Sequence, residues 1–110
     1  MGTTVEEFAR GALDWGADIV GSNCGVGPHE VEVALQKMRA MAPEALLWGE
    51  PNAGLPRMEG TEVVYDLGPN EMADYAEKAY TIGANVIGSC CGSTPEYTRA
   101  IAERVAGMAT

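Results

Sequence analysis

Residues 16–25 read GADIVGSNCG, and residues 83–92 repeat this pattern as GANVIGSCCG. In both copies a short apolar run lies between glycines, which predicts a buried strand. Each strand leads into a glycine-rich turn that carries cysteine, and Pro28 or Pro95 follows at the same offset, where proline suits the first turn of a helix. Both copies therefore predict one unit, in which a strand ends at a cysteine-bearing turn in front of a helix.

Helical and strand patterns alternate along the rest of the chain. Four helices are predicted: residues 5–13 after Thr3 or Thr4, residues 28–42 before Pro43, residues 72–80 before Gly83, and a last one capped by Thr94. Three buried strands are expected at residues 17–21, 45–48 and 84–88, with a short extended piece at 61–65 inside a long loop that begins near Glu50. This alternation indicates parallel strands joined by right-handed crossovers, hence an α/β fold.

The composition is that of one globular domain over residues 1–110, with 46% hydrophobic and 21% charged residues. The net charge is -9 and the basic residues are scattered, so a nucleic-acid surface is not expected. No apolar run reaches the roughly 18 residues that a membrane helix needs, and the first residues lack a signal-peptide pattern. We therefore expect a cytoplasmic protein without a membrane segment.

The three cysteines are an odd number, which argues against a disulfide framework and leaves metal binding, catalysis or simple burial. Cys24, Cys90 and Cys91 follow predicted strands, and parallel strands end at a shared edge, so the thiols are expected on one rim. Three thiolates suit a catalytic zinc, because they leave the fourth tetrahedral position for water or substrate. Gly88 and Gly92 let the chain turn so that adjacent cysteines can reach one ion. Burial without metal and a strained disulfide between Cys90 and Cys91 are the alternatives.

Three motifs in order give the chain a family resemblance. They are GSNC at 21–24 with Gly27 and Pro28, EPNAGLP at 50–56, and GSCCGSTPE at 88–96. Together they resemble the carboxyl-terminal half of the zinc-dependent homocysteine S-methyltransferases. The resemblance implies a partial (β/α)8 TIM barrel of about three parallel strands with four helices. It also implies that Cys24, after the sixth barrel strand, and Cys90 and Cys91, after the eighth, are the zinc ligands.

The resemblance further implies an S-methyltransferase activity with homocysteine and a methyl donor as substrates. Homocysteine sulfur would take the open zinc position, become a thiolate at neutral pH and attack the methyl group, which forms methionine. We expect Asn23, Glu50 and Asn52 to bind substrate at the same rim, although a solvated carboxylate is an equal alternative for Glu50. Asn52 can also offer its side-chain oxygen to the metal when substrate is absent.

The resemblance covers about three of the eight strands of such a barrel. We therefore expect turnover to need the missing amino-terminal half, and the methyl donor is not set by this segment. A three-stranded parallel sheet would also leave two unpaired edges and an apolar face, which predicts self-association or a complementary amino-terminal half as partner. The alternative is a catalytically silent zinc-binding half-barrel or assembly module, which methyl transfer to homocysteine would distinguish.

Overall fold

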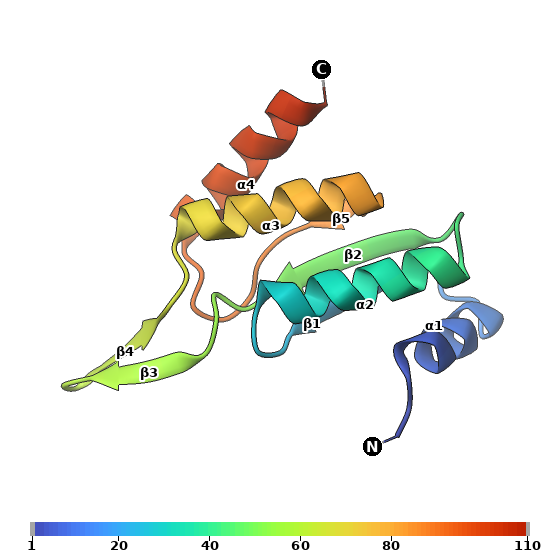
Figure 1. Ribbon diagram of the computed structural model, residues 1–110, viewed down its shortest axis with the longest axis horizontal. Helices are drawn as coiled ribbons and strands as arrows, with labels where there is room; N and C mark the ends of the chain where they lie inside the picture. Colours follow the sequence, from blue (N-terminus) through green and yellow to red (C-terminus); the bar gives the residue numbers. More distant parts are fainter. Residues whose placement is uncertain (1, 110) are drawn as a thin grey trace.

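Three parallel strands form the central sheet of the computed structural model, which describes residues 2–109 (Figure 1). The strands are β1 (Ile19–Cys24), β2 (Leu46–Pro51) and β5 (Val86–Ile87), with β2 in the middle. The helices are α1 (Val5–Asp14), α2 (Pro28–Met41), α3 (Pro69–Ile82) and α4 (Pro95–Met108). The predicted alternation of helices and strands, and hence the α/β class with three parallel strands, is confirmed.

The helix ends follow the signals in the sequence. Thr4 caps α1, and its hydroxyl oxygen accepts the backbone N–H of Glu7 at 3.0 Å. Pro28, Pro69 and Pro95 each stand in the first turn of a helix, where a missing N–H costs nothing. Gly83 ends α3 at φ 101°, a left-handed conformation that glycine adopts without a steric penalty.

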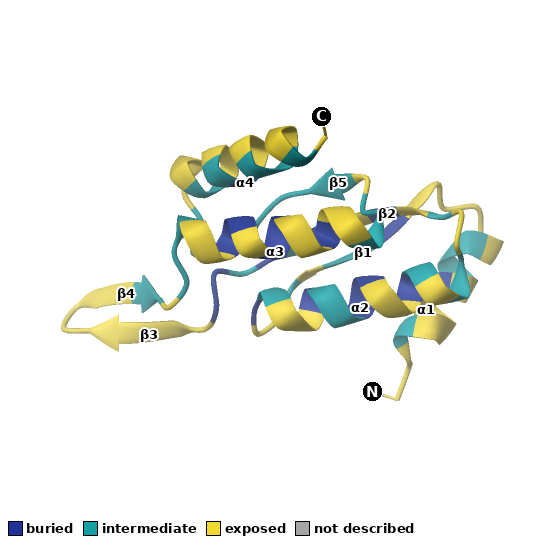
Figure 2. Cartoon of the chain, turned by 45° about the horizontal axis from the view of Figure 1, so that its top comes forward, coloured by how far each residue is buried: buried dark blue, intermediate teal, exposed yellow. Residues whose placement is uncertain are grey.

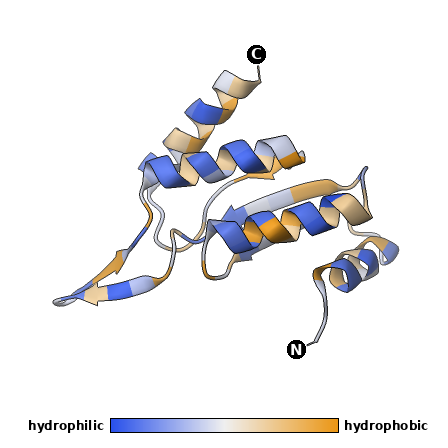
Figure 3. Cartoon of the chain, viewed as in Figure 1, coloured by the Kyte–Doolittle hydropathy of each residue, from blue (hydrophilic) through white to orange (hydrophobic). Residues whose placement is uncertain are grey.

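The core lies between the sheet and the helices α2 and α3, whose buried sides appear in dark blue in Figure 2. Leu35 of α2, Leu47 of β2 and Met72 of α3 are fully enclosed there. The solvent-facing side of both helices is hydrophilic. Hydrophilic and hydrophobic residues therefore alternate along each helix in Figure 3. Burial of this apolar stripe, at about 25 cal/mol per Å² of apolar surface, is the main force that holds the helices on the sheet.

The opposite face of the sheet is open among the described residues, which corrects the expectation that all three strands are buried. Ile19, Leu46 and Trp48 are 39%, 44% and 42% exposed, whereas Val20 and Leu47 are buried. Successive strand residues point to opposite faces, so a sheet covered on one side buries only every second residue. Within residues 2–109 no layer covers the second face, and the predicted apolar face is confirmed.

Residues 56–65 form a hairpin where the sequence analysis expected a loop with one extended piece. Strand β3 (Pro56–Glu59) pairs antiparallel with β4 (Glu62–Tyr65), and the hairpin projects from the body of the molecule (Figure 1). The extended piece expected at 61–65 is β4. Its partner β3 is not expected from the sequence, because its residues have no strand pattern, and all of them are exposed. The turn residues 50–56 also begin later than expected, because Glu50 and Pro51 continue β2.

The third strand is shorter than its apolar run. Only Val86 and Ile87 pair with β2 as a strand, but the hydrogen bonds to β2 extend beyond them. The side-chain oxygen of Asn85 accepts the N–H of Leu47 at 3.0 Å, and the Gly88 N–H donates to the Gly49 carbonyl at 2.9 Å.

No helix within residues 2–109 combines the length and the hydrophobicity that a bilayer crossing requires.

Candidate metal centre

The three cysteine sulfurs lie together at the carboxyl-terminal edge of the sheet. Cys24 ends β1, while Cys90 and Cys91 belong to the turn after β5. All three Sγ atoms lie within 4.8 Å of one another, at 2.9 Å for Cys24 to Cys90 and 3.9 Å for Cys90 to Cys91. All three cysteines are free thiols, and Cys91 is exposed. The structure therefore brings together the three thiols that the sequence places on one rim.

A left-handed backbone turn aims the first of these thiols. Cys24 has φ 56°, and among the described residues it is the only non-glycine residue with positive φ. Strand alternation would put its side chain on the same face as the buried Val20. The strand ends at this left-handed residue, and the Cys24 sulfur lies 2.9 Å from the Cys90 sulfur. Such a conformation is uncommon outside glycine and is found at functional sites.

The end of β2 holds the turn that carries the other two thiols. The Cys90 N–H donates to the Pro51 carbonyl at 2.7 Å, and the Cys91 carbonyl accepts the Ala53 N–H at 2.9 Å. Within the turn, the Ser93 N–H donates to the Cys90 carbonyl at 3.1 Å. The two cysteines are thus attached through their backbone to the middle strand, and their side chains are left for the site.

Asn52 lies between the two cysteine turns. Its side-chain nitrogen donates to the Gly25 carbonyl at 2.9 Å, and its side-chain oxygen accepts the Cys91 N–H at 3.1 Å. Both polar ends of the amide are therefore engaged with backbone, one on each side of the cluster. This geometry gives Asn52 a role in placing the thiols, beside the substrate role expected from the sequence.

Asn23 and Glu50 face each other across β1 and β2, next to the cysteines. The Asn23 side-chain nitrogen lies 3.2 Å from the Cys24 sulfur, to which it donates. The Glu50 carboxylate accepts the indole N–H of Trp48 at 2.6 Å and lies beside Gly88. All six candidate residues from the sequence therefore gather at this edge. Trp48 had no signal as a site residue, because a tryptophan in a strand usually belongs to the core.

The contact between Cys24 and Cys90 shifts the pKa values of the two thiols in opposite directions. The pKa of Cys24 is raised to about 11, mainly by the hydrogen bond with Cys90 and secondly by burial. The same hydrogen bond lowers the pKa of Cys90. The Cys90 sulfur is therefore the one of the two that loses its proton more readily.

The cluster has the composition and nearly the spacing of a zinc site. Zinc–sulfur bonds of about 2.3 Å in a tetrahedron place sulfurs about 3.8 Å apart. The Cys90 to Cys91 separation of 3.9 Å matches this spacing. The pair Cys24 and Cys90, at 2.9 Å, would have to open by about 0.9 Å. These residues could therefore hold one metal ion with three soft ligands and one open position.

Comparison with known proteins assigns the chain to a family. The family model described as homocysteine S-methyltransferase matches residues 1–105. The chain belongs to the homocysteine S-methyltransferase family. This homocysteine S-methyltransferase family member is 36% identical to methionine synthase of Mycobacterium leprae (strain TN) over 94 residues, which are 83% of this chain. It is 35% identical to methionine synthase of Mycobacterium tuberculosis (strain ATCC 25618 / H37Rv) over 96 residues, 84% of this chain. In both cases the match spans 8% of the relative's own length.

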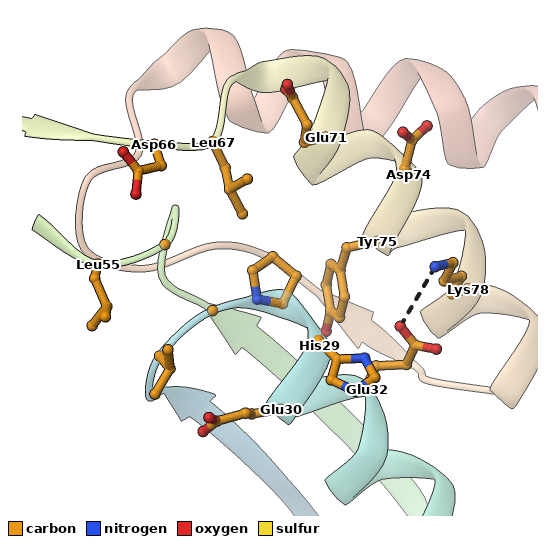
Figure 4. Close-up of a pocket in the computed structure, with 14 residues that line it drawn as sticks. His29, Glu30, Glu32, Leu55, Asp66, Leu67, Glu71, Asp74, Tyr75 and Lys78 are labelled. Atoms are coloured by element: carbon orange, nitrogen blue, oxygen red, sulfur yellow. Dashed lines mark ion pairs between the residues drawn. The ribbon is translucent and has the colours of Figure 1, made fainter.

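A separate hollow of about 550 Å³ lies between the start of α2, α3 and the base of the hairpin (Figure 4). Its wall carries five carboxylates, from Glu30, Glu32, Asp66, Glu71 and Asp74. Most of these carboxylates already have an ion-pair or hydrogen-bond partner. Glu32, for example, forms an ion pair with Lys78 at 3.9 Å. None of the three cysteines lines this hollow, so it is separate from the candidate metal centre at the edge of the sheet.

Proposed function

We propose that this chain is the zinc-binding part of a homocysteine S-methyltransferase, with Cys24, Cys90 and Cys91 as the zinc ligands and homocysteine as the substrate. A bound zinc would lower the pKa of the substrate thiol, so that a thiolate is available at neutral pH to attack a methyl donor and form methionine. The supporting observation is the convergence of three sulfurs within 4.8 Å, from two strand ends, in a member of this family.

The residues beside the thiols would orient the substrate. Asn23 and Glu50 are paired across the sheet, and Trp48 holds the Glu50 carboxylate at 2.6 Å. A carboxylate in this position would accept hydrogen bonds from the substrate's ammonium group, and the Asn23 amide would donate to its carboxylate. The three thiols must stay reduced to bind zinc, which favours the cytoplasm as the place of work.

A complementary amino-terminal half would cover the open face of the sheet and complete a (β/α)8 barrel. The face that carries Ile19, Leu46 and Trp48 is apolar and exposed, and the outer edges of β1 and β5 have no neighbouring strand within residues 2–109. Such edges and faces are normally covered in native proteins. Further barrel strands would pair with both edges at once, whereas self-association through this face would cover the apolar residues but leave the edges open.

Zinc content and methyl transfer test the proposal together. The 110-residue chain should bind one zinc, and it should methylate homocysteine only when the complementary half is supplied. The assay uses a methylated corrinoid, betaine and a sulfonium compound in turn, with Cys91→Ala as the variant that loses metal and activity. Absence of zinc binding would refute the metal site. One bound zinc without methionine in either preparation would instead favour the catalytically silent zinc module.

A further inference from the structure

The aromatic ring of Tyr65 lies directly on the cysteine turn. Gly92, which follows Cys91, has φ 84°, and a Cβ atom built on it would overlap the ring carbons Cγ, Cδ1 and Cδ2 of Tyr65. The ring therefore occupies the space that any side chain at position 92 would need. Glycine is required here twice, once for its backbone conformation and once for the close approach of the ring.

The backbone that carries the ring is paired with β3 on one side and anchored by hydrogen bonds at Leu67 on the other. Tyr65 ends β4, opposite Pro56. Two residues further, the Leu67 N–H donates to the Ala53 carbonyl at 3.1 Å, and the Leu67 carbonyl accepts the Tyr97 hydroxyl at 2.6 Å. Ala53 is also the residue whose N–H binds the Cys91 carbonyl at 2.9 Å. The base of the hairpin and the cysteine turn are thus two sides of one hydrogen-bonded unit.

We propose that Tyr65 is a positioning residue for the metal centre, whose ring holds Gly92 in its left-handed conformation and so fixes how Cys90 and Cys91 present their sulfurs. This inference rests on the proposed zinc function. A glycine in an open turn samples many backbone conformations, and a change of conformation at Gly92 would shift the turn that carries the two preceding thiols. The ring removes this freedom before the metal arrives. Outer-shell groups that orient metal ligands commonly change metal affinity by about 10- to 100-fold when they are removed, and we expect an effect of the same order here.

The experiment compares zinc affinity in four forms of the 110-residue chain, by competition with a chromophoric chelator. Tyr65→Ala should weaken zinc binding by about 10- to 100-fold. Tyr65→Phe should keep the wild-type affinity, because the contact with Gly92 uses ring carbons and not the hydroxyl. Val63→Ala, on the same strand but 60% exposed, is the matched control and should also bind as the wild type does.

Cobalt(II) spectra and a double mutant separate positioning from folding. The d–d bands of the cobalt-loaded chain should change in Tyr65→Ala and not in Tyr65→Phe. Gly92→Ala should lose more affinity in the wild-type background than in Tyr65→Ala, because without the ring only the backbone strain remains. If Tyr65→Ala does not fold by circular dichroism, Tyr65→Leu fills the apolar space without a flat ring and should show the same weakened binding.

The possible failures can be distinguished. If the wild type binds no zinc, the proposed function is refuted and this inference falls with it. If the wild type binds zinc and Tyr65→Ala matches it in affinity and cobalt spectrum, only the role of Tyr65 is refuted. Equal weakening in Tyr65→Phe, or strict additivity of Tyr65→Ala and Gly92→Ala, would also overturn it.

Discussion

The side-chain oxygen of Asn52 accepts the backbone N–H of Cys91 at 3.1 Å. Because the nitrogen of the same amide donates to Gly25 at 2.9 Å, one side chain spans the turns that follow β1 and β5. These turns carry all three thiols but share no backbone hydrogen bond of their own among the described residues. Asn52 therefore links the two turns through their backbone, beside the direct contact of the Cys24 and Cys90 sulfurs at 2.9 Å.

Asn52→Ala should weaken zinc binding by about 10- to 100-fold, because both turns lose a shared hydrogen-bond partner. Asn52→Asp keeps an acceptor for the Cys91 N–H but cannot donate to the Gly25 carbonyl, and it should fall between the wild type and alanine. Competition titration measures both variants, with the exposed Asn70→Ala as control. Wild-type affinity in Asn52→Ala would show that the turns hold their spacing without the bridge.

Zinc binding should tighten as the pH rises through neutrality. The hydrogen bond to Cys90 and burial raise the pKa of Cys24 to about 11, so this thiol is protonated at neutral pH and must release its proton to bind metal. Each proton released contributes about tenfold in affinity per pH unit, so Cys24 alone accounts for about 100-fold between about pH 6 and about pH 8. Affinity measured over this range, or proton release measured by calorimetry in buffers of different ionisation enthalpy, tests this. A flat profile would contradict it.

The helices and their ends were predictable because their signals are local. Threonine at a cap, proline in a first turn and Gly83 after the last turn act on the neighbouring backbone alone. An open apolar face follows from the small number of strands, but the apolar runs of β1 and β2 do not show which of their residues it exposes. Ile19 and Trp48 are apolar in either case, and only the neighbours in space decide their exposure.

The sequence predicts which residues form the candidate site and at which edge of the sheet they lie, but not the contacts that position them. Cysteines after two parallel strands must meet at one edge, as Cys24 and Cys90 do at 2.9 Å. Nothing in the sequence indicates that Asn52 binds backbone on both sides, or that Tyr65 covers Gly92. Both contacts depend on how long loops return to the sheet, and loop paths have no periodic pattern.

Two tyrosines should respond in opposite directions to loss of their hydroxyl group. Tyr75 is 3% exposed and its hydroxyl has no hydrogen-bond partner among the described residues, so Tyr75→Phe should stabilise the fold by about 1 kcal/mol. The Tyr97 hydroxyl donates to the Leu67 carbonyl at 2.6 Å, so Tyr97→Phe should destabilise it by about 1 kcal/mol. Urea unfolding of both variants measures the difference, and equal signs would count against these assignments.

The Arg39 guanidinium should be a main source of stability at the edge of the sheet opposite the cysteines. It donates to the carbonyls of Ala42, Pro43, Ala45, Ile82 and Gly83, at 2.7 to 3.3 Å. Arg39→Met would remove the guanidinium from these carbonyls at the ends of α2 and α3, where the Ala42 carbonyl keeps the Ala45 N–H at 3.1 Å. The loss should cost about 3 kcal/mol in urea unfolding. Zinc affinity should stay unchanged under folding conditions, because the thiols lie at the other end of the strands. Arg99→Met, at an exposed position, is the control, and a loss below about 0.5 kcal/mol in Arg39→Met would mean that water replaces the guanidinium at little cost.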